Sequence, residues 1–224
     1  MFLTLHAADG HSFAAWASGP EDATQGVVIL PEIFGITAHI QQMAAHFVRH
    51  GYRAICPALF DRAPHSTGNE VLGYDETGMR RGMALRQVIQ DTDALLDIQA
   101  SARALGGVAR TYLTGFCWGG YLTWRTACLD DQFTAAACWY GGHIVDHCHD
   151  TPQVPVLMHF GAQDAHIPLS DVETIRQAQP DVPIHVYPDA GHAFAREGTP
   201  AWRPESAHLA LERTLAFFDA QKPA

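Results

Sequence analysis

Apolar positions along this chain follow two spacings, one typical of strands and one typical of helices. The continuous run of apolar, mostly β-branched residues at 26–30 indicates a strand that is buried on both faces. Apolar residues recur at helical spacing over residues 38–50, where Thr37 precedes the first turn and Gly51 follows the last. Strands that alternate with helices imply βαβ units, and therefore a mostly parallel central sheet with helices on both faces.

The same pattern predicts the other elements of this α/β fold. Residues 2–6 and 12–17 alternate between apolar and polar, and Asp9-Gly10 between them is typical of a hairpin, so we expect an antiparallel N-terminal edge. Residues 58–76 have no period and are expected to form a loop. Further strands are predicted over residues 52–56, 110–114, 135–140, 154–160 and 182–187, and further helices over 77–105, 118–129, 168–179 and 203–221.

Composition adds limits on the class of protein. The chain has 224 residues, of which 47% are hydrophobic and 17% charged, so we expect a single packed domain over residues 1–224. Lys and Arg number 14 against 24 Asp and Glu, a formal charge of −10 that disfavours binding to nucleic acid or to an acidic membrane surface. We see no signal peptide and no long apolar span, and we expect a cytoplasmic monomer.

The strongest chemical signal is Gly-Phe-Cys-Trp-Gly-Gly at residues 115–120, where a predicted strand turns into a predicted helix. Glycines two residues before and after the central Cys117 permit the tight turn of a nucleophile elbow. The turn leaves the thiol at a helix N-terminus, where the helix dipole favours an anion. The alternative is a structural turn around an inert cysteine. We therefore predict Cys117 as the nucleophile, whereas Cys56, Cys128 and Cys138 fall on strand or helix patterns typical of the core.

A thiol nucleophile needs a base, and the base needs an orienting acid. In α/β folds of this kind they come later in the chain, in the order nucleophile, acid, base. Asp164 lies just beyond the predicted strand 154–160, and Asp171 is a rival acid that falls inside the following helix. His192 lies just beyond the last predicted strand, next to a flexible glycine, whereas His166 and His185 have no comparable position.

A second candidate loop follows the strand at 26–30. Backbone amides in that loop, with Ile33 as the candidate, complete an oxyanion hole whose first half is the amide of Trp118. Glu32 could take the thiol proton, although its spacing alone favours an ordinary acidic loop residue. An arginine at the mouth of the pocket could hold an anionic substrate, and Arg196 and Arg81 are considered for this role against plain surface solvation.

Four segments together resemble the dienelactone hydrolase (carboxymethylenebutenolidase) family. They are Pro-Glu-Ile-Phe-Gly at 31–35, Gly-Phe-Cys-Trp-Gly-Gly at 115–120, Gly-Ala-Gln-Asp at 161–164 and Ala-Gly-His-Ala-Phe-Ala-Arg at 190–196. The resemblance runs from about residue 26 to the end and is weaker over residues 58–84. It implies an α/β-hydrolase fold, no cofactor, and a triad of Cys117, His192 and Asp164.

The resemblance also changes the interpretation of the charged residues. It implies that Glu32 gates the thiol, which is neutral and turned from the histidine at rest, and takes the thiol proton when substrate displaces it. It further implies that two arginines clamp the substrate carboxylate. Arg196 matches one of them, and Arg81 is chosen over Arg80 for the other.

The expected activity is the opening of an enol-lactone ring, with a small anionic lactone or ester as the substrate. The alternatives are an esterase or thioesterase with the same site, and a metal- or thiol-binding protein that uses the histidines and cysteine at residues 143–149. For the metal-binding alternative, the sequence offers no second pair of His or Cys residues that would complete a set of four ligands. No metal is therefore expected at residues 143–149.

Overall fold

The structure, a computed structural model, describes residues 1–221. Contacts between Cα atoms divide the chain into two compact units, Met1–Leu113 and Thr114–Ala224. The sequence predicts a single domain over residues 1–224, of which residues 222–224 lie outside the described part, and this remains a prediction.

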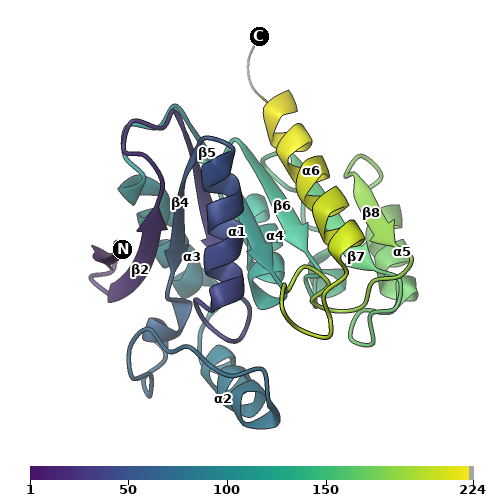
Figure 1. The fold of residues 1–224 in the computed structure, drawn as a ribbon, viewed down its shortest axis with the longest axis horizontal. Helices are drawn as coiled ribbons and strands as arrows, with labels where there is room; N and C mark the ends of the chain where they lie inside the picture. Colours follow the sequence, from purple (N-terminus) through teal and green to yellow (C-terminus); the bar gives the residue numbers. More distant parts are fainter. Residues whose placement is uncertain (222–224) are drawn as a thin grey trace. The chain divides into compact units, whose positions relative to one another are not determined.

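The first unit contains a four-stranded arrangement whose edge is antiparallel. Strand β1 (Phe2–His6) pairs antiparallel with β2 (Ser12–Ser18), β2 pairs antiparallel with β4 (Tyr52–Pro57), and β4 pairs parallel with β3 (Gln25–Leu30). The predicted antiparallel N-terminal edge is therefore confirmed. Every side chain from Val27 to Leu30 is fully buried, as the apolar run predicts. Helices α1 (Ala38–Arg49) and α3 (Asp91–Ala104) lie on opposite faces of these strands (Figure 1).

The second unit repeats the alternation of strand and helix. Strand β5 (Arg110–Phe116) begins in the first unit and ends in the second, where β6 (Ala135–Trp139), β7 (Val156–Gly161) and β8 (Ile184–Tyr187) follow it in that order. β6, β7 and β8 pair in parallel, with Ala136 opposite Val156 and Met158 opposite Ile184. The helices are α4 (Trp118–Leu129), α5 (Leu169–Ala178) and α6 (Pro204–Ala220), with a short 3₁₀ helix, η2 (Val145–His147).

The predicted long helix over residues 77–105 is wrong as a single element. Helix α2 (Glu76–Gln87) ends before Val88, whose side chain is 52% exposed, and α3 starts afresh at Asp91. Asp91 and Asp93 in the first turn of α3 suit a new helix start, because carboxylates are favourable at the positive end of the helix dipole. The face that α3 buries includes Asp97 and Ile98.

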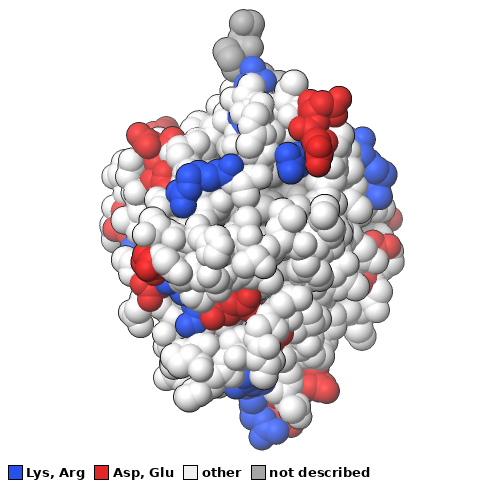
Figure 2. Space-filling model, turned by 90° about the vertical axis from the view of Figure 1, so that its left-hand side faces the viewer, with Lys and Arg blue, Asp and Glu red and all other residues white. Residues whose placement is uncertain are grey.

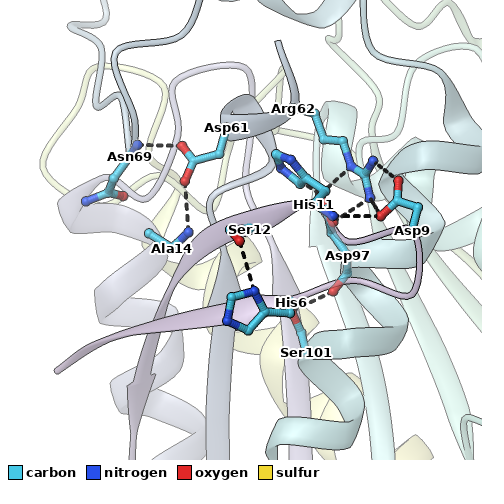
Figure 3. A network of polar contacts seen from close by, with 10 residues as sticks. All are labelled: His6, Asp9, His11, Ser12, Ala14, Asp61, Arg62, Asn69, Asp97 and Ser101. Carbon is cyan, nitrogen blue, oxygen red and sulfur yellow. Dashed lines mark hydrogen bonds and ion pairs between the residues drawn. The ribbon is translucent and has the colours of Figure 1, made fainter. Parts of the chain in front are cut away.

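The predicted loop over residues 58–76 contains a 3₁₀ helix, η1 (Leu59–Arg62), that ends in a buried ion-pair network (Figure 3). The Arg62 guanidinium donates to both carboxylate oxygens of Asp97, at 2.9 and 2.8 Å, and to Asp9 in the β1–β2 turn. Asp61 accepts from the backbone amide of Ala14 in β2 at 2.8 Å. These contacts anchor the N-terminal hairpin to η1 and α3.

Charged side chains are scattered over the surface that includes the N-terminal hairpin. Figure 2 shows basic and acidic groups in small separate clusters with uncharged surface between them, so the acidic surplus forms no continuous field on this face. None of the helices within residues 1–221 combines the length and the apolar character that a membrane span needs.

Candidate active site

Cys117 occupies a strained turn between β5 and α4. Its backbone has φ 54° and ψ −114°, a conformation that is rarely adopted by residues other than glycine. The Cys117 amide donates to the carbonyl of Trp139 at 3.0 Å, and its carbonyl accepts the first helical hydrogen bond, from Tyr121. The geometry is therefore that of a nucleophile elbow, with the side chain presented at the N-terminus of α4.

The glycines around the elbow are required by close backbone approaches. A Cβ atom at Gly115 would lie 2.2 Å from the carbonyl oxygen of Gly119, and one at Gly120 would lie 2.5 Å from that of Trp139. Both contacts are with backbone atoms, one in the first turn of α4 and one at the end of β6, and these cannot move aside as a flexible side chain can. A steric cause is thus given for Gly115, two residues before Cys117, and for Gly120, three residues after it.

Gly115→Ala is expected to lower the free energy of unfolding by about 1–3 kcal/mol, because the turn must open to admit the methyl group. It should also reduce hydrolytic activity, since the same movement displaces Cys117. Urea unfolding and an ester-hydrolysis assay measure the two effects. The matched control is Gly142→Ala, where a Cβ would meet nothing within 4 Å. Equal unfolding midpoints for the two variants would contradict the steric explanation.

The structure brings Cys117, His192 and Asp164 together within the second unit. His192 Nδ1 donates to Asp164 Oδ2 at 2.8 Å, and the Cys117 side chain lies within hydrogen-bonding reach of the same ring. Because Asp164 occupies Nδ1, the nitrogen that remains for Cys117 is Nε2. Asp171, the rival acid, lies in the first turn of α5 beside Ser170. The thiol faces the histidine, whereas the family resemblance implies a resting thiol that is turned away.

Electrostatics favour a charged histidine at this site. Burial lowers the pKa of His192, but the hydrogen bonds to Asp164 and Cys117 outweigh it and raise the pKa to about 10. For Asp164, burial raises the pKa, yet the His192 contact and two backbone donors bring it below the usual aspartate value. Those donors are the amides of His166 at 2.8 Å and Ile167 at 3.1 Å, both to Oδ1. The pair is therefore arranged as carboxylate and imidazolium.

Cys117 differs from the other four cysteines in its exposure. It is half-buried, while the other four are buried free thiols. Burial raises the pKa of each of these buried thiols, to about 12 in the case of Cys128. Cys148, which the sequence leaves without an assigned purpose, is only 1% exposed. A buried thiol that resists ionisation is a poor nucleophile, so only Cys117 combines access with a charged partner.

A second group of predicted residues gathers within the first unit. Glu32 is fully buried, and Ile33 is 7% exposed. The loop that carries them is packed tightly, because a Cβ at Gly82 of α2 would lie 2.0 Å from the Ile33 carbonyl oxygen. A Cβ added at Gly35, which has φ +77°, would likewise lie 2.0 Å from the carbonyl oxygen of Glu70. The segment with the weaker family resemblance therefore braces the Glu-Ile-Phe-Gly loop. The roles of Glu32 and Ile33 remain predictions.

The two neighbouring arginines of α2 differ in their surroundings. Arg81 donates to both carboxylate oxygens of Glu70, at 3.0 and 2.6 Å, and to the carbonyl of His65. Arg80 is mostly exposed and has an i,i+4 contact of 3.8 Å with Glu76. Arg196 is half-buried in the turn that follows His192, where its amide donates to Ala193. The substrate contacts of Arg196 and Arg81 remain predictions.

The histidines and the cysteine at residues 143–149 do not converge on one point. Among residues 1–221, no group of three His, Cys, Asp or Glu side chains is placed to hold a metal ion. His143 pairs with Asp146 at 2.9 Å, His147 lies 3.6 Å from Asp150, and Cys148 is buried. The side chains are divided between local ion pairs and the interior, so the metal-binding alternative has no geometric support.

Two residues beside His192 were not predicted as part of the site. The ring of Tyr140, just after β6, is fully buried and lies 5.2 Å from the His192 ring. The ring of His166 lies 5.1 Å from it, nearly perpendicular at 84°. A sequence signal existed for each, since Tyr140 ends a strand next to the elbow strand and His166 is two residues after the predicted acid. Neither position alone indicates that the side chain contacts the His192 ring.

The three side chains of the candidate triad follow three strands of one sheet in the order that α/β-hydrolases use. Cys117 comes after β5, Asp164 after β7 and His192 after β8. The fold and this site define an α/β-hydrolase.

Comparisons with known proteins identify the family. Residues 13–222 match the model of the dienelactone hydrolase family, and the chain belongs to that family. It is accordingly a carboxylic ester hydrolase that acts on lactones or esters. The chain is 29% identical to a carboxymethylenebutenolidase of Pseudomonas putida over 225 residues, which cover 96% of this chain and 94% of that one. It is 32% identical to a Yersinia pestis protein named as a candidate carboxymethylenebutenolidase, with coverage of 93% and 84%.

A solved structure supports the fold independently. The crystal structure of a candidate dienelactone hydrolase from Klebsiella pneumoniae aligns with a TM-score of 0.84 and 32% sequence identity, over 98% of this chain and 99% of that one. The predicted α/β-hydrolase fold is thereby confirmed.

Proposed function

We propose that this enzyme opens the ring of a small anionic enol-lactone through an acyl-enzyme formed on Cys117. The observation that carries the proposal is the His192 ring, held at Nδ1 by Asp164 at 2.8 Å and hydrogen-bonded to Cys117 on its other side. Nucleophile, base and orienting acid are the three parts that covalent acyl transfer needs.

In the first step the Cys117 sulfur attacks the lactone carbonyl as a thiolate. At neutral pH the imidazole of His192 is protonated, since its pKa is about 10, and it hydrogen-bonds to the sulfur. The amide of Trp118 lies in the first turn of α4, at the positive end of the helix dipole, and in this proposal it donates to the developing oxyanion. The amide of Ile33 supplies the second donor in this proposal, by resemblance to the family.

In the second step the C–O bond of the ring breaks and an enolate leaves, still attached to the acyl group. The enolate takes the proton of His192, which balances the charge. Acylation consumes the thiolate, one of the groups that raise the pKa of His192, so that pKa falls. The neutral imidazole, still oriented by Asp164, then deprotonates a water molecule that attacks the thioester. Hydrolysis returns the proton to His192 and the negative charge to Cys117.

Two further groups tune this cycle in the proposal. Glu32 receives the thiol proton if Cys117 rests in the neutral form, a role taken from the family resemblance. Arg196 binds the substrate carboxylate, because a guanidinium donates two parallel hydrogen bonds to a carboxylate. Arg81 is the second clamp, and its ion pair with Glu70 must then be shared or exchanged when substrate binds.

A progress curve on dienelactone, with and without prior iodoacetamide treatment, tests the function. We expect hydrolysis in the untreated enzyme and its loss in proportion to alkylation of Cys117, read by mass spectrometry. Bound dienelactone should slow the alkylation. Unchanged hydrolysis after complete alkylation of Cys117 would overturn the proposal.

A panel of aryl esters and thioesters separates the two substrate hypotheses. Turnover of these compounds without turnover of dienelactone would keep the same triad and make the enzyme an esterase or thioesterase. Failure to form an acyl-enzyme with any of them would contradict the mechanism.

A further inference from the structure

The His192 imidazole is enclosed by four groups, and two of them, the rings of Tyr140 and His166, have no role in the reaction described so far. Asp164 binds Nδ1, Cys117 faces the other nitrogen, and the buried ring of Tyr140 lies 5.2 Å away at an interplanar angle of 63°. The fourth group is the ring of His166, at 5.1 Å and 84°. Unlike Tyr140, His166 is exposed, so its ring stands on the solvent side of the catalytic pair.

Local geometry places the His166 ring there. Its backbone amide donates to Asp164 Oδ1 at 2.8 Å, and the next amide, of the buried Ile167, donates to the same oxygen at 3.1 Å. The turn then ends at Pro168, which precedes α5. Asp164 thus binds the ring of His192 through one oxygen and the backbone that carries His166 through the other. This sharing fixes the two histidines relative to each other.

A histidine held by one hydrogen bond can still rotate away from its nucleophile, because the bond to Asp164 leaves the ring free to tilt. Lateral ring contacts remove that freedom, and perpendicular aromatic pairs are a favourable geometry for it. Tyr140 supplies such a contact on the buried side. The solvent side has His166, whose backbone is already fixed by Asp164.

We infer that His166 is a positioning residue: its ring forms the outer wall that holds the His192 imidazole between Asp164 and Cys117. The expected effect on hydrolysis rests on the proposed function. The positioning itself does not, because it concerns only how the His192 ring is held against the Cys117 thiol. The wall acts through His192 and does not need to touch the substrate.

The test compares His166→Ala, which removes the ring, with His166→Phe, which keeps an aromatic ring without its nitrogens. His166→Ala is expected to lower kcat on an aryl ester or dienelactone about 2- to 12-fold with KM unchanged, as the loss of one aromatic contact implies. His166→Phe should restore most of kcat. The matched control is His208→Ala, which removes an exposed histidine from α6 and should leave kcat at the wild-type value.

A second readout separates failure of this inference from failure of the proposed function. The rate of Cys117 alkylation by iodoacetamide at pH 6–7 reports the thiolate that His192 supports, whether or not the enzyme hydrolyses any lactone. His166→Ala should slow the alkylation by a similar factor, and His166→Phe should restore it.

Three results would overturn the inference. One is a wild-type alkylation rate in His166→Ala. Another is a raised KM with unchanged kcat, which would indicate a substrate contact. The third is a folded His166→Phe variant, by circular dichroism, that alkylates as slowly as His166→Ala.

Discussion

Cys117→Ala is expected to lower kcat for lactone or aryl-ester hydrolysis at least about 10⁴-fold, because in the proposed mechanism Cys117 is the nucleophile and the residues of a triad act as a unit. The four remaining thiols cannot take over, since they are buried. The variant should keep its fold, because Cys117 is half-buried and sits in the turn through its backbone. Steady-state kinetics and circular dichroism measure the two outcomes.

The control for this variant is Cys148→Ala, which removes a thiol from the same unit but outside the triad. Its activity should match that of the wild type. In Cys117→Ala the pKa of His192 should fall below its value of about 10, because one of the groups that raise it is gone. Titration of the ring by NMR checks this shift. Hydrolysis at more than a hundredth of the wild-type rate would rule out Cys117 as the nucleophile.

Arg62→Ala is expected to lower the free energy of unfolding by about 3–5 kcal/mol near neutral pH, because it removes the guanidinium that pairs with the buried Asp97 carboxylate and leaves that carboxylate with the more distant His11 ring, at 4.0 Å. Asp97 is fully buried, and the Arg62 side chain is only 8% exposed. Urea unfolding measures the loss. Asp9→Ala should cost less, since Asp9 is a more exposed member of the same network, with a side chain that is 38% exposed.

The loss in Arg62→Ala should also depend on pH. Burial raises the pKa of Asp97, and the Arg62 contacts oppose this rise in the native protein. Without Arg62 the pKa rises further, so the neutral carboxyl is favoured in the folded state and the destabilisation shrinks as the pH falls. The double variant Arg62→Met, Asp97→Leu should recover much of the loss, because no buried charge remains. A loss that is independent of pH would show that Asp97 is not its origin.

Much of the fold could be predicted from the sequence because its inner strands, such as β3, β6 and β7, are buried on both faces. Residues 26–30 read as one apolar run, and all of Val27 to Leu30 are fully buried. The break between α2 and α3 was missed because apolar residues continue through it at helical spacing. Val88 fits that spacing but is exposed. The spacing of apolar residues indicates which side chains could lie on the buried face of a helix. Whether they are buried depends on the neighbouring elements that pack against that face.

The second unit's part of the site was predictable for a different reason. Cys117, Asp164 and His192 each follow a strand, and the carboxyl ends of neighbouring parallel strands meet at one edge of a sheet. The walls around His192 were not predictable, because Tyr140 and His166 reach it through turn geometry that no spacing encodes. The ion pair of Arg81 was equally unpredictable, because its partner Glu70 lies in a segment whose apolar residues follow no regular spacing.

The two carboxylate oxygens of Asp164 accept hydrogen bonds from different groups, Oδ2 from the His192 ring and Oδ1 from two backbone amides. This explains why an aspartate suits this position better than a glutamate. Oδ1 accepts from amides two and three residues ahead, a closure that only a side chain with a single methylene group can make. Glutamate would preserve the charge that His192 needs, but its longer side chain could not close the same turn and hold the ring at once. The choice of acid at this position is therefore constrained by side-chain length as well as by charge.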